Sequence, residues 1–414
     1  MFNNAISGLR AASTDLSVVS NNVANASTTG FKSSRAQFAD MYAANASPSN
    51  AVGMGAKLAG VNQIFTQGSL NVTNNSLDLA VDGQGFFGVT DGGTMVYTRA
   101  GAFGTDRDGY IVNNAGQRLA GYLANGAGAV TSQLGELRID TSNMPPSATG
   151  SGTASLNLDA GSLAPAAAWS GPFAFGGPGP LPETYNSASS LTIYDSLGNP
   201  HTLSLYFVRG AGNAWNVHSL VDGVTVGASP AATLQFDANG VIDPATAELS
   251  LAGWQPLDAN GVANGAALQG FTFSLAGATQ FASPFSVNAL SQDGFGAGEF
   301  SRIGIDASGV ITSFFSNGQS KALGQVALYS FANPQGLQQL GDSAWAETPS
   351  SGAAIVGAPG TGSLGLVQSG ALEDSNVDLT AELVHLILAQ RNYQANAKTI
   401  QTADSVTQAI MNLR

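Results

Sequence analysis

Few side chains in this sequence could catalyse a reaction or bind a metal ion. The 414 residues contain no cysteine, which excludes thiolate nucleophiles and thiolate metal ligands. Three histidines occur, far apart in the sequence: His201, His218 and His385. The acids of the expected loops show no spacing that pairs two carboxylates for acid–base catalysis: Asp195, Asp222 and Asp237. We therefore expect no enzyme, no metal site and no cofactor.

Two segments resemble ligand-binding motifs. Gly83, Gly85 and Gly88 match the dinucleotide-binding pattern G-x-G-x-x-G, but the residues that follow, VTDGG, predict a strand and a turn. A dinucleotide site needs a helix at that point, so we interpret the glycines as a tight β crossing. Residues 106–117, DRDGYIVNNAGQ, resemble the start of a Ca²⁺ loop, but the glycine comes early and Gln117 replaces the bidentate glutamate. We interpret this segment as a hairpin turn, with a loose surface Ca²⁺ site as the alternative.

Composition narrows the class of protein further. Glycine is frequent, at 52 residues, and charged residues make up only 10% of the chain, which is typical of turn-rich β structure. The formal net charge is −13 and the 14 Lys and Arg residues are not clustered, which disfavours nucleic-acid and anionic-membrane partners. No apolar run is long enough for a membrane span, and the first residues lack the pattern of a cleaved signal peptide.

The first residues have the heptad pattern of a helix that packs against other helices. Large apolar residues recur every seven positions, and smaller ones follow three positions after each: Phe2, Leu9, Leu16 and Val23, with Ala5, Ala12, Val19 and Ala26. The segment Asn25-Ala26-Ser27-Thr28-Thr29-Gly30 then predicts the end of the helix, because Gly30 can adopt a positive φ.

The last residues predict a second and longer helix. From Asn376 or Asp378, either of which could cap the helix, the chain runs to Arg414 without glycine or proline. Its apolar stripe includes Leu379, Leu383, Leu386, Tyr393, Ile400, Val406 and Ile410. The two helices could form a simple hairpin that caps the β structure, but such a pair would leave much apolar surface exposed. We therefore expect helices from other copies of the chain to cover it.

Between the two helices the sequence reads as β structure. Apolar and polar residues alternate, and turn signals such as Asn239-Gly240 separate the runs. Composition changes near 142–152 and 278–300 predict that one β domain is inserted in another. The predicted fold class is mainly β with long α-helical termini. Four parts are expected: terminal helices (1–26 with 371–414), a connector (27–70 with 361–370), a discontinuous β domain (71–145 with 286–360) and an inserted outer β domain (146–285).

Several segments resemble the bacterial flagellar axial proteins, the family of rod, hook and hook-junction subunits. The motifs are NNVANASTTGFKSSR near the start, LDLAVDGQGFFGV in the first β stretch, and SGALEDSNVDLTAELVHLILAQRNYQANAKTIQTADSVTQAIMNLR at the end. These terminal motifs are similar across the whole family. The chain length and two further segments are most similar to the hook members: SLTIYDSLGNPHTLSLYFVRGAGNAWNV (190–217) and LGQVALYSFANPQGLQQLGDSAWAET (323–348).

The resemblance implies a structural subunit that polymerises into a curved tubular hook, a flexible universal joint that transmits torque from rod to filament. It also implies contacts with other copies and with rod, hook-cap, hook-length-control and hook–filament junction proteins. Export would use the flagellar type III apparatus, without a cleaved signal peptide, and the location would be extracellular. The alternatives are a distal rod or hook-junction protein, a secreted β-rich glycan-active enzyme, and an adhesin. A glycan-active enzyme would need acids clustered in a groove, whereas the acids here are scattered, and an adhesin gives no reason for paired terminal helices.

The expected functional residues follow from the helical stripes and from the resemblance. The assembly interface is expected at Phe2, Leu9, Leu16, Val19, Val23, Leu379, Leu383, Leu386, Tyr393, Ile400, Val406 and Ile410. The resemblance implies a connector motif at Asn25, Thr29, Gly30, Phe31 and Lys32. It also implies a short export signal at Phe38 and Tyr42.

Overall fold

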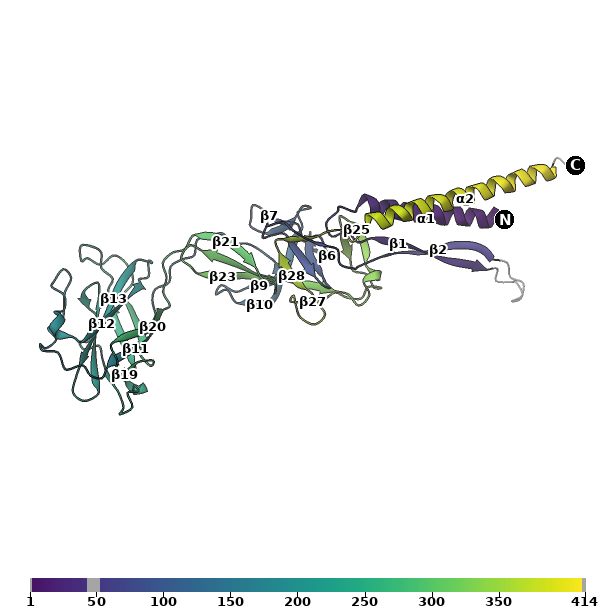
Figure 1. The fold of residues 1–414 in the computed structure, drawn as a ribbon. Helices are drawn as coiled ribbons and strands as arrows, with labels where there is room; N and C mark the ends of the chain where they lie inside the picture. Colours follow the sequence, from purple (N-terminus) through teal and green to yellow (C-terminus); the bar gives the residue numbers. More distant parts are fainter. Residues whose placement is uncertain (1, 43–52, 412–414) are drawn as a thin grey trace. The chain divides into compact units, whose positions relative to one another are not determined.

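Strands make up most of the chain, and a long helix lies at each end. The computed structural model describes residues 2–42 and 53–411. The helices are α1 (Phe2–Ala24) and α2 (Leu379–Met411), so the predicted fold class, mainly β with helical termini, is confirmed (Figure 1). Asp378 caps α2, since its side chain accepts hydrogen bonds from the backbone N–H groups of Thr380 and Ala381. Among the described residues, no helix combines the length and apolar character that a bilayer crossing requires.

The chain folds as two compact units. The first unit comprises residues 1–141, 301–314 and 320–414, and the second comprises residues 142–300 and 315–319. The chain enters the second unit at residue 142, close to the predicted residue 146. It leaves the second unit after residue 300, whereas the sequence predicts this boundary after residue 285. The difference arises because β20 (Ser286–Gln292) pairs with β11 (Ser151–Asp159) and so extends a sheet of the second unit.

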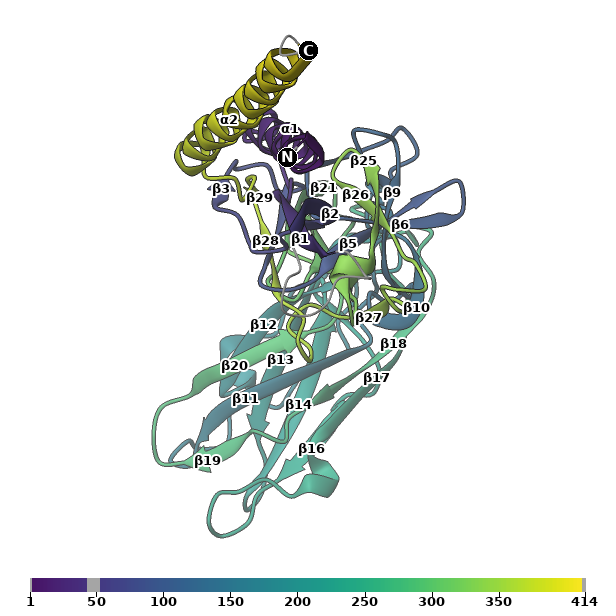
Figure 2. The ribbon, with the colours of Figure 1, turned by 90° about the vertical axis from the view of Figure 1, so that its right-hand side faces the viewer.

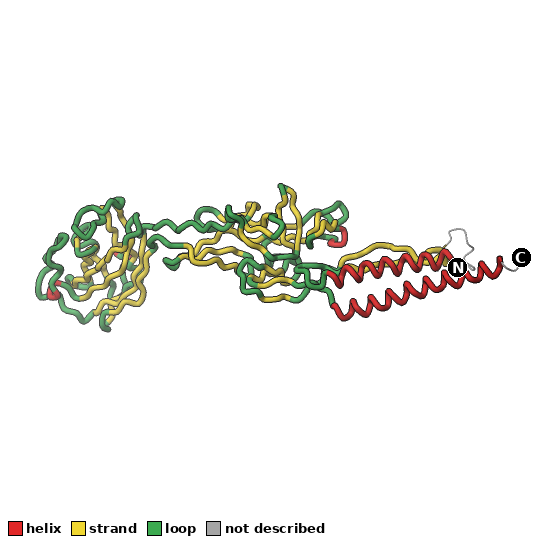
Figure 3. Tube along the Cα trace, turned by 90° about the horizontal axis from the view of Figure 1, so that it is seen from above, coloured by secondary structure: helices red, strands yellow, loops and turns green. Residues whose placement is uncertain are grey.

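A two-stranded ribbon follows α1 in the first unit. Its strands, β1 (Ser34–Tyr42) and β2 (Gly53–Gln63), pair antiparallel, and both contact α1. α1 lies between this ribbon and α2, as the views in Figures 1 and 3 show. The helix therefore has one face against a helix and another against strands.

Most other strands of the first unit form one large sheet with antiparallel pairing. Its 13 strands in the described chain are β5 (Phe86–Asp91), β6 (Thr94–Thr98), β7 (Phe103–Thr105), β8 (Ile111–Asn113), β9 (Arg118–Ala124), β10 (Val130–Glu136), β21 (Phe300–Ile305), β22 (Val310–Phe315), β23 (Ser320–Val326), β24 (Leu328–Ser330), β25 (Gln338–Gly341), β26 (Ala344–Ala346) and β27 (Ile355–Gly357). Two small sheets join distant parts of the sequence: β3 (Leu70–Val72) with β29 (Ala371–Glu373), and β4 (Leu79–Asp82) with β28 (Leu366–Ser369). Through these pairings, the strands that precede α2 in the sequence lie beside strands from the first part of the chain.

The second unit consists of two five-stranded sheets around one core (Figure 2). One sheet contains β11, β20, β17 (Glu248–Trp254), β18 (Gln269–Ser274) and β19 (Thr279–Phe281). The other contains β12 (Ser187–Tyr194), β13 (Pro200–Arg209), β14 (Ala214–Val221), β15 (Val224–Thr225) and β16 (Ala232–Gln235). Alternate residues of both sheets fill the core, among them Phe207, Trp215, Leu249 and Phe273. Three short 3₁₀ helices complete the described elements: Pro182–Thr184, Pro244–Thr246 and Pro334–Gly336.

Candidate assembly surface and connector junction

α1 and α2 pack as an antiparallel pair. Near the end of α1, the Asn22 side-chain amide donates a hydrogen bond to Glu382 Oε1 at 3.2 Å. Near the start of α1, Gly8 lies directly against Asn396, and a Cβ at this glycine would overlap the Asn396 side chain. These two contacts fix the register, because residue numbers rise along one helix as they fall along the other.

The seam predicted on α1 divides into buried and open positions. The buried positions are small or branched, with one amide among them: Ala5, Ala12, Val19 and Asn22. The larger positions are half-buried or exposed: Leu9, Leu16, Val23 and Phe2. Close packing within the chain therefore uses the small residues, and the large ones retain surface that another helix could cover.

The stripe that α2 turns toward α1 coincides only in part with the stripe that the sequence predicts. Ala389 is buried, and half-buried residues lie on the same side of the helix: Glu382, Leu386, Asn396, Ala397, Ile400 and Ala403. Of the predicted interface residues, Leu386 and Ile400 lie on this stripe. Four others are exposed: Leu379, Leu383, Tyr393 and Val406. The side chain of Ile410 lies outside the described residues.

The first turns of α2 are apolar on almost every side. Besides Leu379 and Leu383, the exposed surface includes three residues that the predicted stripe missed: Val384, Ile387 and Leu388. Ile387 is 50% exposed. A helix that is apolar all round is normally enclosed by other elements, and contiguous apolar surface of this kind marks an interaction site. We regard these turns as the candidate assembly surface.

The connector motif forms a tight loop between α1 and the ribbon. Gly30 has a φ of 68°, which favours glycine. A Cβ at this position would also collide with the backbone of Ala100, so both the backbone conformation and the available space require glycine. The Gly30 N–H donates a hydrogen bond to the carbonyl oxygen of Glu373 at 2.8 Å. The other motif residues are half-buried or buried in the same loop: Asn25, Thr29 and Phe31.

Lys32, the last motif residue, belongs to a buried cluster of three charges that we call the junction triad: Lys32, Arg99 and Glu373. Lys32 Nζ lies 2.6 Å from Glu373 Oε1, and Arg99 Nη1 lies 3.1 Å from Glu373 Oε2. The Lys32 and Glu373 side chains have no exposed surface. Lys32 Nζ also donates to the carbonyl oxygen of Thr66 at 2.7 Å, and the Gly68 N–H donates to Glu373 Oε1. Segments from both ends of the chain therefore meet at one carboxylate.

The junction triad carries one more positive than negative charge. Burial lowers the pKa of Lys32 below its ordinary value, and the attraction of Glu373 opposes that shift. Burial likewise lowers the pKa of Arg99, again against the attraction of Glu373. Because two cations depend on one carboxylate, removal of Glu373 would leave both without a counter-charge.

Two asparagines connect the helices to the ribbon beside the triad. Asn22 of α1 accepts the Ser34 N–H at 2.9 Å and donates to the Ser34 carbonyl oxygen at 2.8 Å. Asn376 accepts the Ser33 N–H at 2.8 Å and donates to the carbonyl oxygen of Ile64 at 2.7 Å. Of the two candidate caps, Asp378 therefore caps α2, and Asn376 bridges to the ribbon.

The segment expected as an export signal lies in strand β1. Phe38 is paired with Leu58 of β2, and both side chains are partly exposed, Phe38 at 39%. The side chain of Tyr42 lies outside the described residues. The export signal remains a prediction.

The segments that resemble ligand-binding motifs are turns of the first unit. Gly83 and Gly85 have positive φ and lead into strand β5, with no helix after them. In the 106–117 segment, Asp106 Oδ1 accepts the N–H groups of Asp108 and Tyr110, which closes a hairpin turn between β7 and β8. No cluster of three or more potential metal ligands occurs in the described parts of the chain.

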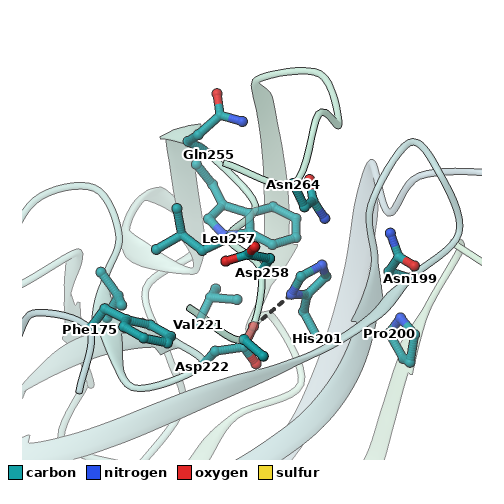
Figure 4. Close-up of a pocket in the computed structure, with 13 residues that line it drawn as sticks. Phe175, Asn199, Pro200, His201, Val221, Asp222, Gln255, Leu257, Asp258 and Asn264 are labelled. Carbon is teal, nitrogen blue, oxygen red and sulfur yellow. Dashed lines mark hydrogen bonds and ion pairs between the residues drawn. The ribbon is translucent and has the colours of Figure 1, made fainter. Parts of the chain in front are cut away.

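The three histidines lie in separate places. His218 stacks on Trp169 with ring centroids 4.1 Å apart, and burial lowers its pKa to about 4. His385 is exposed on α2. His201 lines a pocket of the second unit with a volume of ≈ 410 Å³ (Figure 4).

The His201 pocket brings a histidine close to two carboxylates. His201 Nδ1 lies 2.6 Å from Asp222 Oδ2 (Figure 4). On the other side of the ring, His201 Nε2 lies 3.3 Å from Asp195 Oδ2. Asp195 is fully buried and also accepts hydrogen bonds from Asn199 and Asn264. A catalytic acid needs a raised pKa, whereas this carboxylate is held as a stable anion that fixes its loop. The arrangement supports a structural role.

Asp195 should make the second unit sensitive to acid. Burial alone would raise its pKa, but the hydrogen bonds from Asn199, Asn264 and His201 outweigh burial and lower the pKa to about 2. A depressed carboxylate pKa contributes stability above about pH 4, and this contribution is lost as the pH falls toward 2. We expect Asp195→Asn to lower the free energy of unfolding by about 1–2 kcal/mol at pH 6, and by about half as much at pH 3.

Urea unfolding of the full chain at the two pH values measures this difference. Asp342→Asn is the matched control, because Asp342 is exposed in a turn with a positive φ that asparagine also adopts. An Asp195→Asn effect that is equal at pH 6 and pH 3 would contradict the explanation.

Comparison with known proteins identifies the family of this chain. Four family models match in chain order: flagella basal body rod protein (2–32), flagellar hook protein FlgE/F/G D1 domain (80–152), flagellar basal body protein FlaE D2 domain (157–295) and flagellar basal body rod FlgEFG protein C-terminal (368–413). The chain is 39% identical to flagellar hook protein FlgE of Escherichia coli, over all of both chains. It is 34% identical to flagellar hook protein FlgE of Borreliella burgdorferi, over 99% of this chain and 98% of the relative. The chain belongs to the flagellar hook protein family.

The fold of this chain is similar to that of a hook protein of known structure. The crystal structure of the Helicobacter pylori flagellar hook protein FlgE2 aligns with 73% of this chain and all of that chain, with a TM-score of 0.54 and 16% sequence identity. At that identity the likeness shows the fold alone. The hook family is structural, so the glycan-active alternative is excluded. The full-length relatives also argue against the distal rod alternative, because they are named as hook proteins.

Proposed function

We propose that this hook subunit polymerises through its terminal helices into a curved hollow tube that connects rod to filament and transmits torque. The observation that carries the proposal is the apolar surface on the first turns of α2, which includes Leu383 and Ile387 and has no cover within the described chain. In a tube of many copies, neighbouring helices would bury it. The proposed assembly interface keeps the predicted residues and adds Val384, Ile387 and Leu388.

The second unit supports the idea of a joint that bends. Between residues 142 and 300 the sequence has a single basic residue, Arg209, and ten acidic ones. Arg209 is used inside the unit, since its Nη1 donates to the carbonyl oxygen of Ala160 at 2.6 Å. Second units of neighbouring copies therefore lack the basic groups for ion pairs with one another. Weak contacts of this kind would let them slide while the helices hold the tube together.

The proposals on export, partner proteins and the connector are supported by membership of the hook family. The subunit would leave the cell through the flagellar type III apparatus, with the segment from Phe38 to Tyr42 as the export signal. It would meet rod, hook-cap, hook-length-control and hook–filament junction proteins at the two ends of the tube. The connector, whose Lys32 belongs to the junction triad, would join the inner helices to the tube wall.

Removal of either helix should abolish assembly and leave the β units folded. The structure sets the cut sites: Asn22 and Asn376 hold the ribbon, so we choose deletions of residues 2–20 and 379–414, which keep both. Electron microscopy of concentrated protein should show short tubes for the full chain and none for either deletion. Circular dichroism should show the same strand signal in all three proteins. Tubes from either truncated chain would refute the proposed role of the helices.

A further inference from the structure

A groove runs between α1 and the ribbon, on the side of α1 away from α2. Its volume is ≈ 590 Å³. Apolar side chains from both elements line it, including Ile6 of α1 with Met41, Met54 and Leu58 of the ribbon. Leu58 is 46% exposed, so the groove is an apolar surface that the described chain leaves open.

Two cations lie along the same groove. Arg10 comes from α1 and Lys57 from β2. Neither has an ion-pair partner among residues 2–42 and 53–411. A segment that fills the groove and carries an acidic side chain would therefore match it in both polarity and charge.

The end of α2 is a segment of that chemistry. Because Gly8 lies opposite Asn396 in an antiparallel pair, α1 begins opposite about residue 402 of α2. The last nine residues of α2 extend beyond α1 by about 13 Å. This overhang carries Asp404 and the exposed side chains of Val406 and Met411. Asp404 accepts a hydrogen bond from Gln408 and has no basic partner among the described residues.

We propose that the groove between α1 and the ribbon receives the α2 overhang of a neighbouring copy, with Asp404 facing Arg10 and Lys57. The inference rests on the proposed function, because it names one contact inside the polymer. The groove is centred near Gly8, opposite Asn396, and the overhang is centred about eleven residues further along α2. A copy shifted along the helix axis by about 16 Å brings the two to the same level.

The proposed contact would cover two surfaces that the single chain leaves open, the overhang and the groove. The overhang packs against no element of the described chain, so no tertiary contact supports this end of α2. The groove in turn exposes apolar surface and two unpaired cations. Insertion covers both surfaces and adds attraction at short range.

Cross-linking tests the contact directly, because the sequence has no cysteine of its own. The variant Leu58→Cys/Val406→Cys places one thiol in the groove and one on the overhang, both at exposed positions. Treatment of assembled tubes with a short bismaleimide should give a ladder of covalent multimers. Dilute monomer and each single-cysteine variant should give no ladder.

Charge exchange tests the pairing of Asp404. Arg10→Glu/Lys57→Glu should raise the critical concentration for assembly about tenfold, since attraction becomes repulsion. Adding Asp404→Lys to this variant should recover most of the loss. Arg107→Glu/Lys321→Glu is the control, because it makes the same change of charge outside the groove lining, in the turn after β7 and in β23, and should leave assembly unchanged.

The outcomes separate this inference from the proposed function. If the full chain forms no tubes under any condition, the proposed function itself fails. If tubes form but the double-cysteine variant gives no ladder, the groove has another occupant and the inference is wrong. A charge exchange that fails to recover assembly, while each variant keeps its circular dichroism spectrum, would overturn the Asp404 pairing.

Discussion

Replacing Glu373 by glutamine is expected to lower the free energy of unfolding of the first unit by about 3–5 kcal/mol. Glutamine keeps the shape of the side chain but removes the only negative charge of the junction triad. Lys32 and Arg99 would then be buried without a counter-charge. For a unit of this size, the loss corresponds to a fall in melting temperature of about 10 °C, which scanning calorimetry measures on the full chain.

Two further variants make this prediction sharp. Lys32→Met should cost less than Glu373→Gln, because it leaves one balanced pair, Arg99 with Glu373. Glu136→Gln removes a partly exposed ion pair with Arg118 and should cost less than about 1 kcal/mol. If Lys32→Met proves as costly as Glu373→Gln, the excess positive charge of the triad is not what makes Glu373 important.

Replacing Ile387 by aspartate is expected to prevent assembly without unfolding the subunit. Ile387 is 50% exposed and lies away from the stripe that packs on α1, so the isolated chain should tolerate the change. In the tube, burial of an unpaired carboxylate would cost several kcal/mol. A cost of about 3 kcal/mol per subunit raises the critical concentration more than about 100-fold. Sedimentation of assembled tubes across a concentration series measures this shift.

The conservative variant Ile387→Leu is the control for that experiment. It keeps an apolar side chain of the same size and should assemble at nearly the wild-type concentration. Both variants should melt at the wild-type temperature. Normal tubes from Ile387→Asp would show that this face of α2 stays in contact with water in the polymer.

The terminal helices were predictable because their signal is local. Heptad spacing in the first residues and the long run without glycine or proline at the end predicted α1 and α2 within a few residues. The face that each helix presents was harder. On α2 the sequence predicted one stripe, whereas the structure has a narrow face against α1 and a broad exposed surface around Leu383 and Ile387. A periodicity cannot tell which of two apolar faces the same chain will cover.

The junction triad could not be predicted in the same way. The motif around Gly30 pointed to Lys32, but its partners Arg99 and Glu373 are distant in sequence and come together only through the pairing of β3 with β29 and β4 with β28. The sequence also predicts the wrong residue for the end of the second unit, 285 instead of 300, for a similar reason. Residues near 286 have the composition of a crossing, yet β20 pairs with β11 and extends the sheet.

The pairing of β3 with β29 and of β4 with β28 also determines when the subunit can finish folding. A ribosome makes the chain from its N-terminus, so Lys32 and Arg99 exist long before Glu373 does. Until the last segment arrives, the first unit lacks two strand partners and its central carboxylate. Contacts between such distant residues form slowly. The first unit can therefore close only in a chain that has been made as far as Glu373, because both strand partners and the carboxylate of the junction triad lie in that last stretch.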